Sequence, residues 1–539
     1  MGGRSLRAET DAGTVDLTVR RGGFEAWACR CGSLRRPTAS LRGVRQLSSP
    51  EAQFLALETP RQRGHVAGVA VLDPSTRPAG TLAVADIQAL IEERLALLPV
   101  LRWRLQEVPL GLDHPYWVED RDFDLNFHVR ELALAAPGSD AQLSEQVARI
   151  IMQRLDRARP LWELYLISGL ASGHVAMLTK IHHALVDGIS GAEITGLLLD
   201  VTPAGRELPA LDPTGGQGSA PGHFGMLARA LRGVPRYSLR AMRSLPAAVP
   251  SLHETRFSTH PAAAAVGSIA ERIERAINGV DGPVHVRERL VAPKTSFNGR
   301  VSPDRCFVFG QLKLDEVKAV KNAYGCTVND VVVSICASAV RQWLIAHDEL
   351  PDSPLVALIP VSVRTDEQTG TYGSRILLMS APLFTDEADS IRRLMRTHEA
   401  LADIKERHDA IPAGLLQDGN NFIATAVYSR AARLTFLLAT SRPGRPTWNL
   451  VISNVPGPPV PLYCAGARLM ANYRFGVITD GMGLNITVMS YCGHLDFAIA
   501  SDREQMPDVT KLMGWLGEAL EELKPTTKWN TGTPESTQW

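Results

Sequence analysis

The stretch HHALVDG, residues 182–188, governs our interpretation of this sequence. It follows an apolar run, Val175–Ile181, that has the composition of a buried strand. Because side chains alternate across a strand, only one of the two histidines is expected to face a given cleft. Asp187 lies four residues after His183, across a turn that Gly188 makes geometrically easy. The Asp187 carboxylate could orient a catalytic histidine directly, or could lock the loop by pairing with an arginine elsewhere. Near neutral pH an imidazole suits a general base that takes a proton from an alcohol or an amine.

Three other roles are conceivable for this stretch. A bare His-His pair at the end of a strand is most often two ordinary polar residues. A metal site is disfavoured, because HHxxxD lacks two histidines four residues apart on a helix and no third ligand is evident. A hydrolase that forms an acyl-enzyme is disfavoured because the chain has no GxSxG nucleophile elbow. The general base is therefore the chemical role that we test.

Strands and helices are expected to alternate on both sides of this stretch. The hydrophobic patterns predict helices over Val84–Leu98, Leu143–Arg157 and Val328–Leu344. They predict further strands over His65–Leu72, Phe307–Leu312, Pro354–Pro360, Leu450–Ile452, Leu484–Tyr491 and Leu495–Ala500. The Pro-, Gly- and Ser-rich residues 203–222 have the composition of a linker. This order indicates two α/β halves joined by a long crossover.

The composition limits the function classes. The chain has 539 residues with 45% hydrophobic side chains, and Lys+Arg and Asp+Glu both total 57. With no net charge there is no global field to attract nucleic acid, so no nucleic-acid partner is expected. The seven scattered cysteines suit a reducing cytosol, and the N-terminus lacks a secretory pattern, so a cytoplasmic location is expected. The longest apolar stretch, Val331–Val340, is too short to span a bilayer and is expected to be a buried helix.

The segment 223–252 combines basic and apolar residues. It holds Arg229, Arg232, Arg236, Arg240 and Arg243 and no acidic residue. Such a stretch suits an interfacial helix on anionic lipid, at the inner membrane or on lipid inclusions. The alternative is a solvated helix packed on the protein, and Gly233 and Pro235 would interrupt either one.

Several sequence blocks, in order, resemble those of a known family. HHxxxDG is shared by coenzyme A-dependent acyltransferases and nonribosomal peptide condensation domains. The other blocks are LSSPEAQFLALETP (47–60), RPLWELYLI (159–167), SFNGRVSPDR (296–305), TVNDVVV (327–333), PVSVR (360–364), SNVPGPPVPLY (453–463) and GLNITVMSYCGHLDF (483–497). From about residue 47 to 520 the chain resembles the bacterial wax ester synthase/diacylglycerol acyltransferase family. One departure is Gly373-Ser374, where the family often has Gly-Asn.

The resemblance implies an α/β fold of two chloramphenicol-acetyltransferase-like subdomains with mixed sheets and an active-site channel at their interface. The expected division is a disordered extension over 1–45, an N-terminal subdomain over 46–202, a crossover with the basic amphipathic segment over 203–284, a C-terminal subdomain over 285–525 and a tail over 526–539.

The resemblance also implies direct acyl transfer without a covalent acyl-enzyme. His183 would deprotonate the acceptor hydroxyl, which attacks the thioester carbonyl of acyl-CoA. The developing oxyanion needs donors placed where the charge appears. His182 would assist at the strand end. Asp187 would lock the loop, with Arg364 as its candidate partner, and Gly188 would keep the turn open.

Six further residues are expected to position substrate. Pro160, Leu161 and Trp162 would brace the acyl channel, with simple packing as the alternative. Asn329 and Asp330 begin the apolar helix, so either N-capping or lining of the site is expected of them. The sixth residue, in the late strand over 484–491, is Asn485.

The expected function is transfer of a long-chain fatty acyl group from acyl-CoA to diacylglycerol, which makes triacylglycerol as storage lipid. Long-chain alcohols are a second expected class of acceptor, and their products are wax esters. Acyl-CoA is the expected co-substrate, with no permanently bound cofactor and no metal. Two rivals stay open at this point. One is another HHxxxDG acyltransferase acting on a different alcohol, and the other is a catalytically silent lipid-binding protein.

Overall fold

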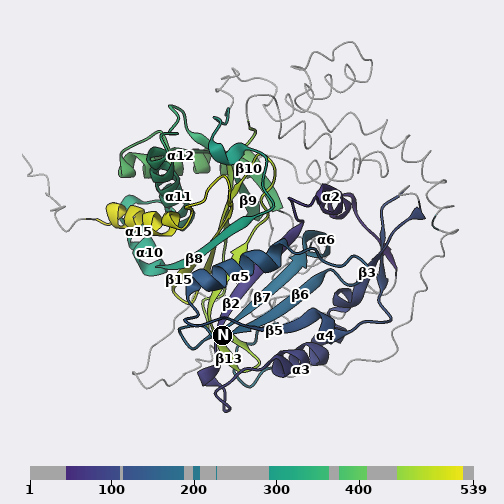
Figure 1. The fold of residues 1–539 in the computed structure, drawn as a ribbon. Helices are drawn as coiled ribbons and strands as arrows, with labels where there is room; N and C mark the ends of the chain where they lie inside the picture. Colours follow the sequence, from purple (N-terminus) through teal and green to yellow (C-terminus); the bar gives the residue numbers. More distant parts are fainter. Residues whose placement is uncertain are drawn as a thin grey trace, which may run out of the picture.

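A computed structural model describes residues 44–109, 113–186, 198–206, 226, 290–362, 376–409 and 446–525 of the chain. In these residues the strands form two six-stranded sheets and one small sheet (Figure 1). The N-terminal sheet has the order β12-β13-β2-β7-β6-β5, and the C-terminal sheet has the order β10-β9-β11-β14-β15-β8. Each contains parallel and antiparallel neighbours, so the predicted α/β fold with mixed sheets is confirmed.

The strands of the N-terminal sheet are β2 (His65–Asp73), β5 (Val129–Ala133), β6 (Trp162–Ser168), β7 (Val175–His182), β12 (Tyr463–Cys464) and β13 (Ala467–Phe475). The small sheet contains β1 (Arg45–Gln46), β3 (Trp103–Gln106) and β4 (Tyr116–Glu119). The helices of this half are α2 (Ser49–Leu57), α3 (Val84–Arg94), α4 (Leu125–His128), α5 (Asp140–Met152) and α6 (His183–Val186).

The strands of the C-terminal sheet are β8 (Arg305–Lys313), β9 (Leu355–Ser362), β10 (Ile376–Leu383), β11 (Leu450–Val455), β14 (Leu484–Tyr491) and β15 (His494–Asp502). Its helices are α10 (Leu314–Tyr324), α11 (Val328–Ala346), α12 (Ser390–Asp409) and α15 (Lys511–Leu523), gathered on one side of the sheet (Figure 1). The predicted strands in both halves are therefore confirmed within one to three residues at each end.

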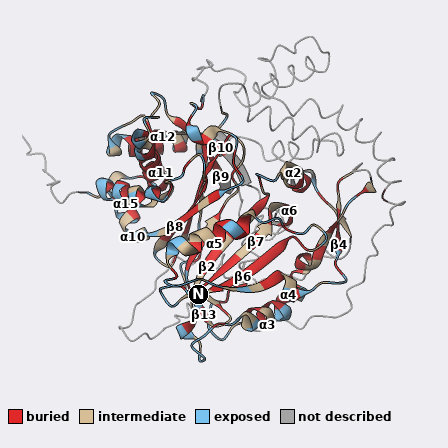
Figure 2. Cartoon of the chain, in the orientation of Figure 1, coloured by how far each residue is buried: buried red, intermediate tan, exposed pale blue. Residues whose placement is uncertain are grey.

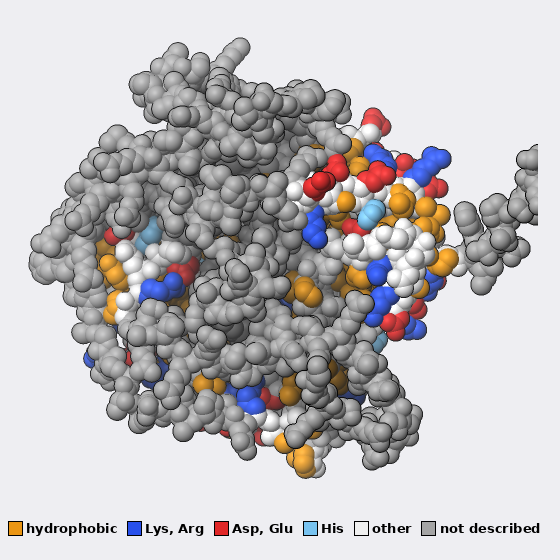
Figure 3. Space-filling view, turned by 180° about the vertical axis from the view of Figure 1, so that it is seen from behind, with side chains coloured by type: hydrophobic (Ala, Val, Ile, Leu, Met, Phe, Trp, Pro, Cys, Tyr) orange, Lys and Arg blue, Asp and Glu red, His pale blue; other side chains and the backbone are white. Residues whose placement is uncertain are grey.

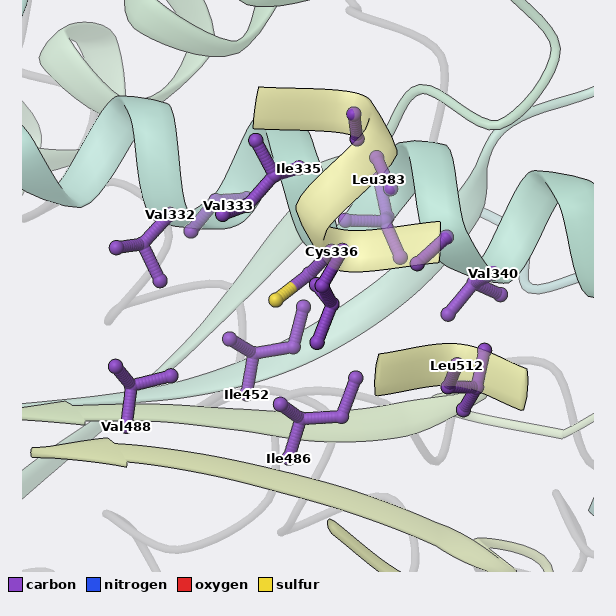
Figure 4. Packing of buried hydrophobic residues seen from close by; sticks show 14 of the residues in the cluster. Val332, Val333, Ile335, Cys336, Val340, Leu383, Ile452, Ile486, Val488 and Leu512 are labelled. Atoms are coloured by element: carbon purple, nitrogen blue, oxygen red, sulfur yellow. The ribbon is translucent and has the colours of Figure 1, made fainter. Parts of the chain in front are cut away.

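The helix α11 forms the centre of the C-terminal half. Its apolar residues are buried on nearly every side, against the sheet and the helices α12 and α15 (Figure 4). By length and composition α11 could cross a membrane, yet 72% of its apolar window is buried inside the protein. The predicted buried helix is thus confirmed, because core packing already uses the apolar surface of α11.

The helix α5 joins the two halves. It packs against β8, and its residues Leu143 and Val147 share a buried cluster with Phe307 of β8 and Phe475 of β13. The strands of both sheets are largely buried, whereas the outer helices mix exposed and buried positions (Figure 2). The helix predicted over 143–157 begins three residues earlier, at Asp140, because Ser139 and Gln142 form a capping box. It ends at Met152, before the predicted end.

One strand pair crosses the predicted division of the chain. β13 pairs antiparallel with β2 along most of its length, so residues 463–475 complete the N-terminal sheet. A division into 46–202 and 285–525 therefore does not describe this sheet, because one edge of it comes from the late part of the sequence. β1 also begins at Arg45, inside the predicted extension 1–45.

Candidate active site

The two histidines lie where β7 ends and α6 begins. His182 is the last residue of β7 and is opposite His65 of β2, whereas His183 is the first residue of α6. The His183 amide donates to the carbonyl of Gly64 (2.8 Å), and the Ala184 amide donates to Nδ1 of His182 (3.1 Å). The two histidines thus have different hydrogen-bond partners, because the chain leaves the strand at His183.

The imidazole of His183 is held by an aromatic neighbour. It stacks on the ring of Phe54 from α2, with centroids 3.7 Å apart and an angle of 14° between the planes. Burial, together with the nearby charge of His182, lowers the pKa of His183 to about 4. Because burial penalises the charged form, His183 is neutral at physiological pH and is in the state that can accept a proton.

Beneath the histidines lies the buried carboxylate of Glu58, which ends α2. Its Oε1 is 3.5 Å from Nε2 of His182 and 3.4 Å from Nε2 of His65, and its Oε2 is 2.8 Å from Nη2 of Arg157. Burial alone would raise the pKa of Glu58, but the two imidazoles and the guanidinium hold it far below its ordinary value. Glu58 is therefore an ionised anchor for this end of the sheet.

Gly64 connects this anchor to His183. Its amide donates to Oε1 of Glu58 (3.2 Å), and its carbonyl accepts the bond from His183 described above. A Cβ at this position would lie 2.7 Å from Nε2 of His182, so there is no room for a larger residue. Gly64 thereby links the backbone of His183 to Glu58, which pairs with His182 directly.

These neighbours were missing from the expected site residues. Phe54 and Glu58 both lie within the quoted block 47–60, but nothing in the sequence indicated that they contact the histidines. Gly64 and His65 follow directly in the loop and strand. The available signal was weak, since a glutamate is rarely buried unless it is paired, and pairing across about 125 residues is not visible in local sequence.

The Pro160-Leu161-Trp162 block braces β7. The carbonyl of Leu161 accepts from the amide of His182 (2.9 Å). Nε1 of Trp162 donates to the carbonyl of Leu101 (2.7 Å), and its ring stacks on His128 at 4.5 Å. Trp162 also lines a small cavity of about 20 Å³ together with Ile91, Leu101, Glu163, Leu164, Thr179, Ile181 and Leu198. The block therefore lies directly behind the histidine pair.

Asn329 and Asp330 have separate roles in the C-terminal half. The N-cap of α11 is Thr327, and the carboxylate of Asp330 completes its capping box and accepts from Nδ1 of His398 at 2.7 Å. Asn329 accepts from Nδ2 of Asn454 at 3.2 Å. Two of the quoted blocks, 327–333 and 453–463, thus meet in space, with Asp330 engaged in holding the helix.

Asn485 is buried on β14. Its Oδ1 accepts from the hydroxyl of Thr487 (3.0 Å), and its Nδ2 donates to the carbonyl of Val477 at 3.4 Å. A Cβ on Gly476 would lie within 2.4 Å of Nδ2, so the backbone passes close to this amide. Asn485 therefore fixes the segment that follows β13.

Three residues expected at the site lie outside the described residues: Asp187, Gly188 and Arg364. The departure at Gly373-Ser374 and all of the segment 223–252 except Met226 also lie outside them. Among the residues that the structure describes, no group of three His, Cys, Asp or Glu side chains is placed to hold a metal ion.

The fold and the histidine pair at the end of a central strand define a two-lobed acyltransferase-like protein. The chain is similar to a wax ester synthase/diacylglycerol acyltransferase from Marinobacter aquaeolei VT8, with a TM-score of 0.61, 29% identity, and coverage of 89% of this chain and 98% of that chain. A condensation domain of the CDA synthetase, with a TM-score of 0.50, 16% identity and coverage of 90% of this chain and 97% of that chain, shares the fold alone.

Sequence comparison is more specific. A Mycobacterium tuberculosis protein that carries the name diacylglycerol O-acyltransferase is 35% identical over 483 residues, which are 89% of this chain and 90% of that protein. The wax ester synthase/diacylglycerol acyltransferase catalytic domain matches residues 47–332, and the C-terminal domain of the same family matches residues 372–524. The chain therefore belongs to the wax ester synthase/diacylglycerol acyltransferase family.

Proposed function

We propose that this protein is an acyl-CoA:diacylglycerol O-acyltransferase, with His183 as its general base. The observation that carries the proposal is the state of His183, which is neutral, stacked on Phe54 and held through Gly64 within the motif of an acyltransferase family. A rigidly held neutral imidazole is the group that proton removal from a hydroxyl requires.

The reaction needs no covalent enzyme intermediate. Nε2 of His183 takes the proton of the acceptor hydroxyl, whose oxygen forms a bond to the thioester carbonyl carbon. The carbon–sulfur bond then breaks, and the leaving thiolate of coenzyme A takes the proton back from the imidazolium. His182, anchored by Glu58, would hold the strand end rather than exchange the proton.

The acceptor is diacylglycerol, with long-chain alcohols as a second class. Support comes from the relatives' names, which include diacylglycerol O-acyltransferase and wax ester synthase/diacylglycerol acyltransferase. The backbone hydrogen bond from His182 to Leu161 and the bond from Trp162 to Leu101 support a role for the block 160–162 in bracing the acyl channel. Asn329 and Asn485 would position the channel from the other half. Asp187 would lock the loop by pairing with Arg364, and Gly188 would keep the turn open.

The test uses the purified full chain with palmitoyl-CoA and either dioleoylglycerol or hexadecanol, with products measured by mass spectrometry. The wild type should form triacylglycerol and release free coenzyme A in equal amounts. His183→Ala should lower turnover by about 10²–10⁴-fold, the usual loss of general base catalysis. His182→Ala should lower it less. A folded His183→Ala protein with near-normal turnover would refute this base, and a wild type that forms no ester would favour a silent lipid-binding protein.

Peripheral binding to membranes or lipid inclusions on the cytoplasmic side is part of the proposal. All the described cysteines are free thiols, which suits a reducing compartment. Within the arginine-rich segment 223–252, the structure describes Met226, which is buried against Tyr116 and Val118 of β4. Replacing five of its arginines with glutamine should release the protein from anionic liposomes, and wild-type binding should fall with salt. If liposome binding were unchanged by the replacements and by salt, the segment would be only a linker.

A further inference from the structure

A cavity of about 170 Å³ with charged residues in its lining lies beside the histidine anchor. It is lined by Glu58, Thr59, Pro60, Arg63 and Arg154. The first four residues form the loop between α2 and β2, and Arg154 follows the end of α5. The proposed reaction does not use either arginine.

The charges around this cavity do not balance. Arg157 is paired with Glu58 (2.8 Å), Lys180 with Glu163 (3.3 Å) and Arg305 with Asp502 (3.3 Å). Within the described residues, neither of the two cavity arginines has a carboxylate partner at such a distance, and Glu58 is already shared with two histidines. The cavity therefore carries an excess of positive charge.

Arg63 is held in a fixed position. Its Nε donates to the carbonyl of Met152 (3.1 Å) and its Nη1 donates to the carbonyl of Thr59 (3.1 Å). The described residues supply no hydrogen-bond acceptor to its Nη2. Burial lowers the pKa of Arg63, Glu58 raises it and the like charge of Arg154 lowers it again. An anion between the two arginines would relieve this repulsion.

The loop that forms the rim is rigid and lies at the seam of the two halves. The backbone of Thr59 and Gln62 exchanges hydrogen bonds of 2.8 and 3.2 Å, and the Thr59 hydroxyl accepts from the Gln62 amide at 3.0 Å. The carbonyl of Arg61 accepts from Nη2 of Arg305, and Oε1 of Gln62 accepts from the Asp480 amide at 3.3 Å. The cavity is thus preorganised, and a ligand there would lie close to the Glu58–His182 pair.

We infer that this cavity binds a phosphate group, and that the group is carried by the coenzyme A moiety of the acyl donor. The inference rests on the proposed acyl-CoA-dependent function and adds a site for the donor. Arginine binds phosphate oxygens through paired N–H donors, and the Thr59 hydroxyl adds a neutral donor. A phosphate held here would anchor the donor at the seam of the two halves, at a site separate from the reacting carbonyl.

The test compares Arg63→Gln/Arg154→Gln with Arg149→Gln as the matched control. Arg149 is an exposed arginine of α5 whose partner is Glu145 on the same helix (3.5 Å). The dissociation constant for free coenzyme A, from calorimetry, should rise about tenfold or more in the double variant and stay unchanged in the control. Arg154→Gln alone, at an exposed position, should raise it about threefold, which keeps the test valid if the double variant misfolds.

Two further arms identify the source of the phosphate. The KM for palmitoyl-CoA should rise in the double variant, whereas the KM for palmitoyl-pantetheine, which lacks phosphate, should equal that of the wild type. Equal increases in KM for both donors, or an unchanged affinity for coenzyme A, would overturn the inference. If the variant lost affinity for phosphatidate-containing vesicles or for inorganic phosphate but not for coenzyme A, the donor assignment would also fail.

This outcome is separable from the proposed function. Calorimetry with free coenzyme A requires no turnover, so the cavity can bind phosphate even if no ester forms. Conversely, the double variant could be active and bind coenzyme A as tightly as the wild type. The proposed function would then stand, and the phosphate site would be refuted.

Discussion

Replacing Glu58 with glutamine tests the buried anchor of the histidine pair. The substitution keeps the shape but removes a charge that contacts His182, His65 and Arg157. Breaking a buried ion pair by removing one partner costs about 3–5 kcal/mol. The side chain of Arg157 is 31% exposed and can turn to water, so we expect a loss of about 2–4 kcal/mol in the free energy of unfolding.

Glu145→Gln is the matched control, because it removes an equally close but exposed partner. Glu145 is 2.6 Å from Arg503, and the two side chains are 42% and 43% exposed. Exposed pairs contribute about 0–1 kcal/mol, so this control should change little. Urea denaturation followed by circular dichroism would measure both variants at pH 7. Equal, small losses in the two variants would refute the view that Glu58 anchors the site.

The pH dependence supplies a second check on the same variant. The folded state holds the pKa of Glu58 below its ordinary value of 4.5, so its contribution is complete above that value and declines as the pH falls below it. The difference between wild type and Glu58→Gln should therefore narrow on acidification below about pH 4.5. A difference that stayed constant down to acid unfolding would mean that the charge of Glu58 is not responsible.

Three further outcomes follow from the site. Because the lowered pKa of His183 keeps its ring neutral, kcat/KM should hold from pH 8 to about 5 and be halved near pH 4, and a midpoint near 6.5 would contradict this. Phe54→Leu should lower kcat about 2–10-fold with little change in KM, since a stacked pair contributes about 0.5–1.5 kcal/mol. An unchanged kcat would show that the stacking on His183 does not contribute to catalysis. Gly64→Ala should lower the free energy of unfolding by about 1–3 kcal/mol in urea denaturation, because its methyl group would meet His182. Gly514→Ala, at a position with open space around it, should not lower the free energy of unfolding. Equal effects of the two substitutions would count against crowding at Gly64.

The strands and the central helix were predictable because their apolar patterns are long and uninterrupted. The run Val328–Leu344 reads as a buried helix in sequence and forms α11, and Val175–Ile181 forms β7 with one more residue. Helix ends were less certain, because α5 stops at Met152 although the pattern continues to Arg157. The residue after Met152, Gln153, already has an extended backbone, and Arg157 pairs with Glu58 (2.8 Å).

The surroundings of the histidines could not be predicted from local pattern. His183 was identified from its motif, but its own contacts come from Phe54 and Gly64, and the anchor of its neighbour His182 is Glu58; all three precede the motif by more than a hundred residues. A glutamate near the end of a short helix is ordinarily solvated, so only the fold shows that this one is buried between two imidazoles and an arginine. The charged residues on the described part of the opposite face are of mixed sign, in agreement with the neutral composition (Figure 3).

The pairing of β13 with β2 has a consequence for synthesis of the chain on the ribosome. Four strands of the N-terminal sheet, β2, β5, β6 and β7, are synthesised early. The strands that complete its other edge lie in residues 463–475 and are synthesised much later. Until then the outer edge of β2 exposes unpaired amides and carbonyls, which is a hazard for aggregation. A fragment ending before β8 should therefore be insoluble or bound by chaperones. We therefore expect that the protein is not divisible at the crossover into independently folding pieces.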